Sequence, residues 1–229
     1  MTIASSYEAI RSEINQVALA CGRDPKEISI LPVSKTHPVS MLEEALAAGI
    51  STFGENRVQE AKSKWEALHA AYPELRFSII GPLQKNKAKY VARFAHEFQA
   101  LDNLEIASVL SDRLEKEDRH LDVYIQINSS GEPQKSGINP QDAALFLDAL
   151  EAFPRLRIKG LMTVAIDQAL SSPEAVRSCF ATTRKLRDDL LPGGELSMGM
   201  SGDYTLAIEE GATVVRIGSA IFGKRDYSV

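Results

Sequence analysis

The sequence has few cysteines and no long apolar run. Its two cysteines, Cys21 and Cys179, are far apart and form no CxxC pair. This arrangement argues against a disulfide framework and favours two reduced thiols in a cytoplasmic protein. No apolar segment is long enough to cross a membrane, and the opening MTIASSYEAI lacks the basic and apolar segments of a secretory signal. We therefore expect a cytoplasmic protein with no membrane partner.

An excess of basic residues is also missing. The 229 residues include 26 Lys and Arg against 31 Asp and Glu, which gives a formal net charge of −5 at pH 7. Nucleic-acid-binding domains normally carry a basic bias, so we expect no nucleic-acid partner. No group of His, Cys or carboxylate residues has the spacing of a metal site, so we expect no metal.

One local basic run stands out against this acidic background: Lys85, Lys87, Lys89 and Arg93. Positions 85, 89 and 93 are four residues apart and would share one face of a helix. We interpret this face first as solvated surface. A second interpretation is a basic rim that attracts an anionic cofactor or a partner protein.

The chain alternates short apolar runs with longer helical patterns. Eight runs predict strands, at 28–35, 51–53, 76–80, 97–100, 121–127, 157–160, 195–197 and 213–217, of which the fourth and seventh are weakest. Helical patterns follow each run, among them 39–48, 55–70, 103–118, 140–153 and 173–190. A helix predicted from Ser5 or Ser6 to Ala20 precedes the first strand and lies outside this repeat.

This alternation predicts the fold class. Strands joined by right-handed helical crossovers form a parallel sheet, and eight such units favour a closed barrel. No linker, internal repeat or low-complexity stretch divides the chain. We predict an α/β protein, a single (β/α)8 TIM barrel with an extra N-terminal helix, in one domain over residues 1–229.

The first predicted strand, ISILPVSK, ends on Lys35 and is followed by His37-Pro38. A proline there stops the extension, and ligands bind at the carboxyl ends of barrel strands. Alone, such a lysine is best interpreted as a side chain lying along apolar surface with its ammonium in water. Barrel closure changes this interpretation, because the first and eighth strands become neighbours and Lys35 and Arg216 reach the same mouth.

Two loops rich in glycine and serine follow the seventh and eighth predicted strands. The first is SMGMSGDY, which contains Ser201, and the second is the Gly218-Ser219 turn that opens a short helix over 219–222. Barrels of this type often bind phosphate at these two loops. For either loop alone, ordinary turn chemistry is the better explanation, with Ser201 or Asp203 capping the next helix. Together, the two loops favour a phosphate site.

A phosphate site opposite a strand-end lysine predicts pyridoxal 5'-phosphate, whose aldehyde forms a Schiff base with a lysine amine. Arg216 would face the pyridine nitrogen. A permanent cation disfavours protonation of that nitrogen and makes the ring a weak electron sink. The alternative for Arg216 is an ion pair with Glu209, Glu210 or another carboxylate.

Six segments resemble the pyridoxal-phosphate homeostasis protein family of the YggS/PROSC type, which is similar to the alanine racemase barrel domain without its β-domain. They are LPVSKTHP, FGENRVQEA, IGPLQKNK, KSGI, GLMT and SMGMSGDYTLAIEEGATVVRIGSAIFG, within residues 31–223. The resemblance implies that Lys35 carries the Schiff base and Arg216 faces the ring nitrogen. It also implies that Ser201, Gly218 and Ser219 hold the phosphate and that Asn56 lies near the ring.

Two of these positions need a comment. Asn56 has an alternative interpretation as the cap of the helix after the second strand. The segment before IGPLQ usually carries a histidine in this family, as in HFIG, whereas this chain has Ser78. A ligand contact made by that histidine would be lost here, but the lysine and phosphate positions are unaffected.

We predict a carrier and regulator in intracellular pyridoxal-phosphate homeostasis that affects amino-acid and keto-acid metabolism. The partners would be the cofactor itself and recipient apoenzymes, and the chain would be a monomer without robust catalytic activity. One alternative is a pyridoxal-phosphate-dependent amino-acid racemase of the alanine racemase type, which needs a second acid–base group opposite Lys35. Tyr204 or His37 would have to supply it, because the β-domain that does so in alanine racemase is not in this chain. A barrel enzyme acting on a phosphorylated metabolite, with no cofactor, leaves the pairing of Lys35 with Arg216 unexplained.

Overall fold

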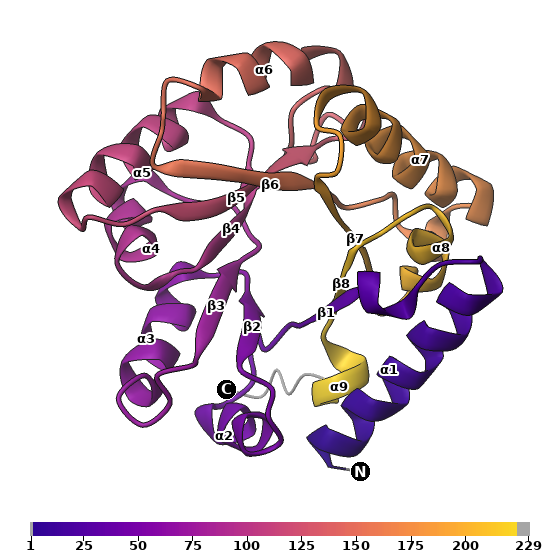
Figure 1. Ribbon diagram of the computed structural model, residues 1–229, viewed down its shortest axis with the longest axis horizontal. Coiled ribbons are helices and arrows are strands. Elements are labelled where there is room, and N and C mark those ends of the chain that lie inside the picture. Colours follow the sequence, from indigo (N-terminus) through magenta and orange to yellow (C-terminus); the bar gives the residue numbers. More distant parts are fainter. Residues whose placement is uncertain (1, 224–229) are drawn as a thin grey trace.

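The computed structural model describes residues 2–223, which form a barrel of parallel strands surrounded by helices (Figure 1). All eight predicted strands are confirmed, including the two weak ones. They are β1 (Ser29–Pro32), β2 (Thr52–Glu55), β3 (Arg76–Ile79), β4 (Glu97–Leu101), β5 (Leu121–Ile127), β6 (Leu156–Thr163), β7 (Glu195–Met200) and β8 (Val214–Ile217). The predicted α/β TIM barrel is therefore confirmed.

The strands follow the order β1-β8-β7-β6-β5-β4-β3-β2 around the barrel, and each neighbouring pair is parallel. The predicted contact between the first and eighth strands is present, with Leu31 opposite Arg216. Within residues 2–223, the ring is closed between β1 and β2 by one isolated bridge, between Val33 and Gly54. The amide of Ser34 also donates to the carbonyl of Gly54 at 3.0 Å. We call this narrow junction the β1–β2 seam.

The helices form the outer layer of the barrel. They are α1 (Ile3–Ala20), α2 (Val39–Ala47), α3 (Val58–Leu68), α4 (Ala88–Phe94), α5 (Leu104–Lys116), α6 (Ala143–Leu150), α7 (Pro173–Leu190), α8 (Tyr204–Glu209) and α9 (Ser219–Phe222), with 3-10 turns η1 (Pro25–Glu27), η2 (Lys85–Lys87), η3 (Pro140–Asp142) and η4 (Gln168–Leu170). Helix α5 shows how the pattern folds locally. Asn103 accepts from the amides of Glu105 and Ile106, and Leu110 and Leu114 are buried one turn apart.

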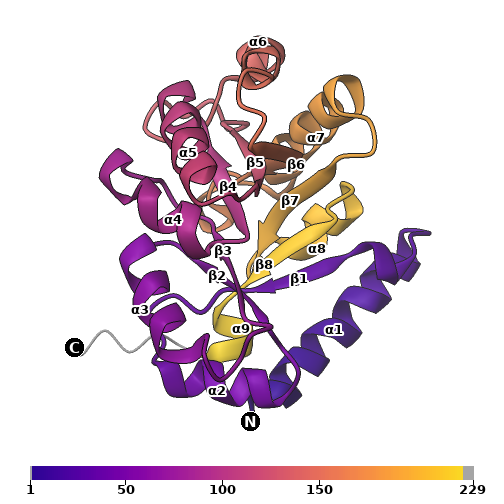
Figure 2. The ribbon, with the colours of Figure 1, turned by 60° about the vertical axis from the view of Figure 1, so that its left-hand side comes forward.

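Helix α1 is the predicted extra helix, and it lies beside α8 and α9 (Figures 1 and 2). Helix α9 has four residues and is only about 6 Å long, so it covers little of the outer face of the last unit. Helix α1 covers this region and buries Ile14 and Ala18. Its cap is Thr2, whose hydroxyl accepts from the Ser5 amide, and the expectation of a cap at Ser5 or Ser6 is wrong.

Two local expectations also need correction. The helix after the second strand begins at Val58, and Glu55 is the last residue of β2. Lys85 lies in the 3-10 turn η2 before α4 begins, so it does not continue the helical face of Lys89 and Arg93. The side chains of all three basic residues are exposed, and Lys85 forms an ion pair with Glu105.

Cys21 and Cys179 are both free thiols, the first exposed and the second buried. No helix in the described part of the chain has the length and apolar character needed to span a membrane.

Candidate functional site

The chain leaves β1 and makes a turn at residues 34–36, which we call the Lys35 turn. Lys35 itself is half-buried and lies three residues beyond Pro32, the last residue of β1, so the expectation that the strand ends on Lys35 is wrong. Thr36 has a φ of 67°, in the left-handed region that a β-branched residue rarely adopts. Its amide donates to Glu60 Oε1 at 2.6 Å, and its hydroxyl donates to the Lys35 carbonyl at 2.6 Å. Lys35 therefore stands on a backbone held in an unusual shape, at the end of the barrel where ligands bind.

A buried charged cluster lies beneath this turn. Lys64 Nζ on α3 donates to Glu55 Oε1 at 2.6 Å, to Glu60 Oε1 at 2.7 Å and to the Ser34 carbonyl at 2.8 Å. The Ser34 hydroxyl donates to the same Glu55 oxygen at 2.6 Å. Burial raises the pKa of Glu55 to about 7, and the attraction of Lys64 only partly offsets this rise.

The sequence patterns did not reveal this cluster. Glu55 and Glu60 both belong to the segment FGENRVQEA, but a helix expected to start at Glu55 would have exposed that carboxylate in its first turn. The strand extends through Gly54 and Glu55, two residues beyond its predicted end, and places Glu55 inside the protein, where its side chain is fully buried. A second signal was available in the spacing of Glu60 and Lys64, four residues apart on α3.

Arg216 fills the interior of the barrel from β8 and is 3% exposed. Its Nη1 donates to the carbonyl and the hydroxyl of Ser197, at 2.7 and 2.8 Å, and its Nη2 donates to the Thr163 carbonyl at 2.8 Å. All three acceptors are neutral. Burial lowers the pKa of Arg216 to about 10, and Asp203 counteracts this shift, so the guanidinium remains a cation at neutral pH.

The alternative ion pair of Arg216 with Glu209 or Glu210 is wrong. Glu209 and Glu210 face α7 instead, where they pair with Arg177 and Arg184. Among residues 2–223, Arg216 forms no ion pair within 4.0 Å. Its positive charge therefore remains uncompensated by direct contact, which suits a group that faces an anion or a basic ring nitrogen.

A chain of hydrogen bonds continues from Ser197 across the barrel. The Ser197 hydroxyl donates to Gln99 Oε1 at 2.7 Å, and Gln99 Nε2 donates to Glu97 Oε2 at 3.1 Å. Ser78, at the position of the family's histidine, donates to the same Glu97 oxygen at 2.9 Å. Burial raises the pKa of Glu97. Ser78 therefore belongs to the polar interior of the barrel, and its hydroxyl bonds to Glu97.

The two loops proposed for phosphate binding meet in the structure. The Gly218 amide donates to the Ser201 hydroxyl at 3.4 Å, and Ser219 opens α9 directly after it. Gly199, in the first loop, has a φ of 93°, and a Cβ there would stand 2.6 Å from the Ala207 Cβ. Only glycine fits this position. The backbone amides and serine hydroxyls of the two loops thus form a donor set suited to phosphate oxygens.

The helix cap considered for Ser201 or Asp203 is not formed. Asp203 occupies the N-cap position of α8, but its side chain makes no capping hydrogen bond. It accepts instead from the Met200 amide at 2.6 Å, within the loop. The Ser201 hydroxyl is used by Gly218 of the following strand–helix unit, which joins the two loops.

Contacts between β1 and β8 join the Lys35 turn to these loops. The Val33 amide donates to the Ile217 carbonyl at 2.8 Å, and a Cβ on Gly218 would stand 3.3 Å from the Val33 carbonyl oxygen. The buried ring of His37 stacks on Phe222 of α9, with the centroids 5.3 Å apart. Five of the six predicted site residues therefore lie on the β1 and β8 side of the barrel mouth: Lys35, Ser201, Arg216, Gly218 and Ser219.

The sixth, Asn56, lies just beyond the end of β2, on the other side of β1. Its interpretation as a helix cap is wrong, because Arg57 holds the N-cap position of α3. Its backbone packs tightly on the next loop, since a Cβ on Gly81 would stand 2.4 Å from the Asn56 carbonyl oxygen. Asn56 also lines a cleft of about 510 Å³ with Gln84 and Lys87.

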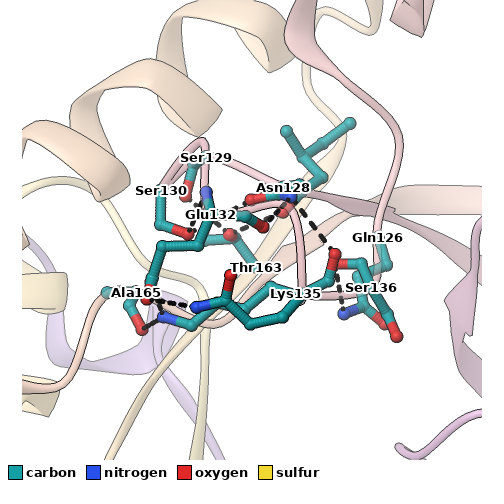
Figure 3. Close-up of polar contacts among 11 residues, drawn as sticks. Gln126, Asn128, Ser129, Ser130, Glu132, Lys135, Ser136, Thr163 and Ala165 are labelled. Atoms are coloured by element: carbon teal, nitrogen blue, oxygen red, sulfur yellow. Dashed lines mark hydrogen bonds and ion pairs between the residues drawn. The ribbon is translucent and has the colours of Figure 1, made fainter.

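The loop after β5 is fixed to the same end of the barrel (Figure 3). Asn128 Nδ2 donates to the carbonyls of Glu132 and Lys135, at 2.9 and 3.2 Å, and Lys135 Nζ donates to the Ala165 carbonyl at 3.0 Å. The hydroxyls of Ser129 and Thr163 are 2.8 Å apart. Because the Thr163 carbonyl also accepts from Arg216, this loop is connected to the buried guanidinium. Thr163 belongs to the GLMT segment, and this segment was the sequence signal that could have pointed to Thr163 as a site residue.

Within the described residues, no group of three or more His, Cys, Asp or Glu side chains is arranged to hold a metal ion.

Comparison with known proteins gives concordant results. The family model of the alanine racemase N-terminal domain matches residues 6–226. The Pyridoxal phosphate homeostasis protein of Pseudomonas aeruginosa is 43% identical over 227 residues, covering 99% of this chain and 97% of that protein. PipY of Synechococcus elongatus has been solved without and with PLP bound. The two structures match with TM-scores of 0.85 and 0.81 at 32% and 31% identity, and each match covers 97% of this chain and 100% of PipY.

A more distant likeness concerns the fold alone. Alanine racemase of Bartonella henselae, solved with covalently bound pyridoxal phosphate, matches with a TM-score of 0.71 at 14% identity. The match covers 99% of this chain and 60% of that one, so this barrel corresponds to part of the racemase. The full-length matches at 31–43% identity and the family model lead to one conclusion. The chain belongs to the alanine racemase N-terminal domain family and, within it, to the pyridoxal phosphate homeostasis proteins.

Proposed function

We propose that this chain binds pyridoxal 5'-phosphate and acts in its intracellular homeostasis, as a carrier and regulator in one barrel domain over residues 1–229. The full-length likeness to the homeostasis protein of P. aeruginosa and to PipY with PLP bound supports this function. The observation that carries the proposal is the pairing of β1 with β8. It brings the Lys35 turn, the buried Arg216 and the Ser201–Gly218 contact to one mouth.

Each site residue has a role in this proposal. The Lys35 amine would hold the cofactor covalently through its aldehyde carbon. Arg216 would face the pyridine nitrogen and disfavour its protonation. The hydroxyls of Ser201 and Ser219, with the Gly218 amide, would bind the phosphate, and Asn56 would lie near the ring. When bound, the cofactor supplies an electrophilic aldehyde and a weak electron sink.

The positions of Tyr204 and His37 favour a carrier over a racemase. A racemase needs a second acid–base group across the ligand from Lys35. Tyr204 is buried at the start of α8 and hydrogen-bonds to Glu13 of the outer helix α1. His37 is buried against Phe222. The Tyr204 hydroxyl is thus engaged with α1 and the His37 ring packs on α9, which supports a carrier.

The proposal extends to partners and location. Recipients of the cofactor would be pyridoxal-phosphate-dependent apoenzymes in the cytoplasm, and the protein would act as a monomer. Sedimentation of the loaded protein, alone and mixed with an apoenzyme, tests both the monomer and a direct complex. A stable dimer of the loaded chain would contradict the proposed monomer.

The absorption spectrum of the loaded protein tests the attachment of the cofactor at Lys35. We expect a visible band that borohydride removes, with the reduced adduct found on the peptide containing Lys35. Lys35→Ala should abolish both signals, whereas Lys89→Ala, at an exposed lysine, should leave them unchanged. A Lys35→Ala protein that keeps the band would overturn the assignment.

A further inference from the structure

We infer that Glu60 and Lys64 of α3, with Glu55 of β2, are positioning residues that hold the Lys35 turn and so set the rate and affinity with which Lys35 captures an aldehyde. This inference rests on the proposed function of Lys35 as the attachment point. None of the three needs to touch the cofactor. Their contacts are to the backbone on both sides of Lys35, through the Ser34 carbonyl and the Thr36 amide.

The first observation is the conformation of Thr36. A threonine in the left-handed region is strained, and such a conformation persists only where the surroundings hold it in place. Here the Thr36 amide is bonded to the Glu60 carboxylate at 2.6 Å, a short charge-assisted hydrogen bond. Without this acceptor, the residue has a strong preference for other regions of φ. The orientation of Lys35, the preceding residue, would then change.

The second observation is how deeply the cluster is built into the protein. The side chains of Lys64 and Glu55 are 6% and 0% exposed, and Glu60 is 24% exposed. Lys64 Nζ uses its three donors on Glu55, Glu60 and the Ser34 carbonyl. A buried ion pair adds little stability compared with apolar residues of the same size, so its value lies elsewhere. The cluster fixes one geometry of the turn through fully specified hydrogen bonds.

The third observation is the direction from which the cluster acts. It approaches the turn from β2 and α3, whereas His37 and Phe222 approach it from the α9 side. The β1–β2 seam has little strand pairing of its own. The charged cluster therefore supplies, on this side of Lys35, the rigidity that strand pairing supplies on the β8 side.

The test measures the rate of pyridoxal-phosphate capture by stopped-flow absorbance, and its dissociation constant, with the full-length protein. Glu60→Ala removes the acceptor of the Thr36 amide, and we expect capture to slow by about tenfold or more, as for other small displacements of a reacting group. Glu60→Gln keeps an oxygen acceptor and should stay within about twofold of the wild type. Thr36→Gly in the Glu60→Ala background should restore much of the rate, because glycine adopts a positive φ without strain.

Two further variants separate positioning from stability. Glu66→Ala, on the same helix, breaks the exposed pair with Lys62 and should leave capture unchanged. The double variant Glu55→Gln/Lys64→Met removes both deeply buried charges together. It leaves only the Glu60 carboxylate, which is 24% exposed and keeps its bond from the Thr36 amide. We expect it to fold and to capture the cofactor slowly.

Wild-type rates and affinity in both Glu60→Ala and the double variant, whatever their stability, would overturn the inference. Equal slowing in Glu60→Ala and Glu60→Gln, without recovery by Thr36→Gly, would also overturn it. The proposed function fails separately, if the wild-type protein forms no borohydride-trapped adduct on Lys35.

Discussion

Buried charge distinguishes several of the residues that we propose for function in this barrel. Arg216 is held inside the strands by three neutral acceptors, and Glu55 and Lys64 are buried together beneath the Lys35 turn. Charged groups are expensive to bury, so they occur where their hydrogen bonds define a geometry that apolar packing does not define. Each of these groups has specific hydrogen-bond partners, so a substitution that removes one partner has a defined expected effect.

Arg216→Lys should destabilise the protein although it keeps the charge. The guanidinium spans from Ser197 on β7 to Thr163 on β6, whereas one ammonium cannot reproduce this fork. Leaving a buried acceptor unpaired lowers the free energy of unfolding by about 1–3 kcal/mol. Urea denaturation measures the change. Arg157→Lys, at an exposed arginine paired with Asp122, is the control and should change it little. Equal effects of the two substitutions would contradict the prediction.

Glu55→Gln should remove part of the pH dependence of stability. The folded protein holds a proton on Glu55 up to a pKa of about 7, well above the usual 4.5, because burial penalises the carboxylate. Between these two values the folded state binds more protons than the unfolded state. The free energy of unfolding therefore falls as pH rises from about 4.5 to 7, by at most about 1.4 kcal/mol per pH unit for this group.

Glu97 and Asp203 are also buried acids with raised pKa values, so they too make stability depend on pH. Because both are present in the wild type and in Glu55→Gln, comparing the denaturation of the two proteins across this window isolates the contribution of Glu55. The variant should show the shallower decline. Parallel curves for the two proteins would refute the contribution of Glu55.

At the scale of elements, the loop from β7 to α8 is shaped by close packing of its backbone. Gly199 combines a left-handed conformation with a helix directly against it, so that its Cα faces the Ala207 Cβ. This contact fixes the loop that carries Ser201. The loop geometry, and with it the proposed donor set for phosphate, therefore depends on the helix that follows it.

Gly199→Ala should cost more stability than the same substitution at Gly193. Gly193 also has a positive φ, of 81°, but open space surrounds it, so an added methyl group meets only the backbone strain of about 1 kcal/mol. At Gly199 the clash adds about 1–3 kcal/mol of overpacking. Thermal or urea unfolding of the two variants tests the difference. Gly199→Ala should also weaken phosphate binding, whereas Gly193→Ala should leave it intact. Equal losses of stability in the two variants would show that the close approach of Gly199 to Ala207 adds no cost.

At the scale of the whole molecule, the barrel is unevenly closed. Seven strand pairs form ladders, of which β4–β5, β5–β6 and β7–β8 each contain a register shift. Among the described residues, the β1–β2 seam is held by the Val33–Gly54 bridge and the Ser34 amide. The seam runs directly beside the Lys35 turn. The part of the barrel with least strand pairing is thus at the proposed site of cofactor capture.

Hydrogen exchange of backbone amides should reveal this asymmetry. The Ser34 amide depends on the seam, whereas those in β5 and β6 belong to a ladder of seven residue pairs. We expect Ser34 to exchange through a local opening of lower free energy than global unfolding, with β5 and β6 close to the global value. Equal protection at the seam and in β5–β6 would show that side-chain contacts alone close the barrel firmly.

Much of the fold could be predicted because it depends on local patterns. Apolar runs such as 121–127 and 213–217 predicted strands, and Pro173 and Asn103 marked helix starts that the structure confirms or places nearby. The boundaries of helices and strands were harder to predict where one residue fits two elements, as Glu55 fits both the end of a strand and the start of a helix. The six candidate site residues were also predicted, and their contacts with the cofactor stay predictions that the spectra and variants above will test.

Local sequence patterns were enough to predict the eightfold alternation, the position of Lys35 close after the first strand and the place of Arg216 in the last strand, because each depends on residues adjacent in the chain. How these elements meet depends on contacts between distant parts of the chain. Arg216 finds its acceptor at Thr163, 53 positions away, and the Ser34 hydroxyl finds Glu55 across the seam, 21 positions away. The left-handed Thr36 depends in the same way on Glu60 of α3. Such partners cannot be read from local pattern, since burial and hydrogen bonding are properties of the assembled barrel.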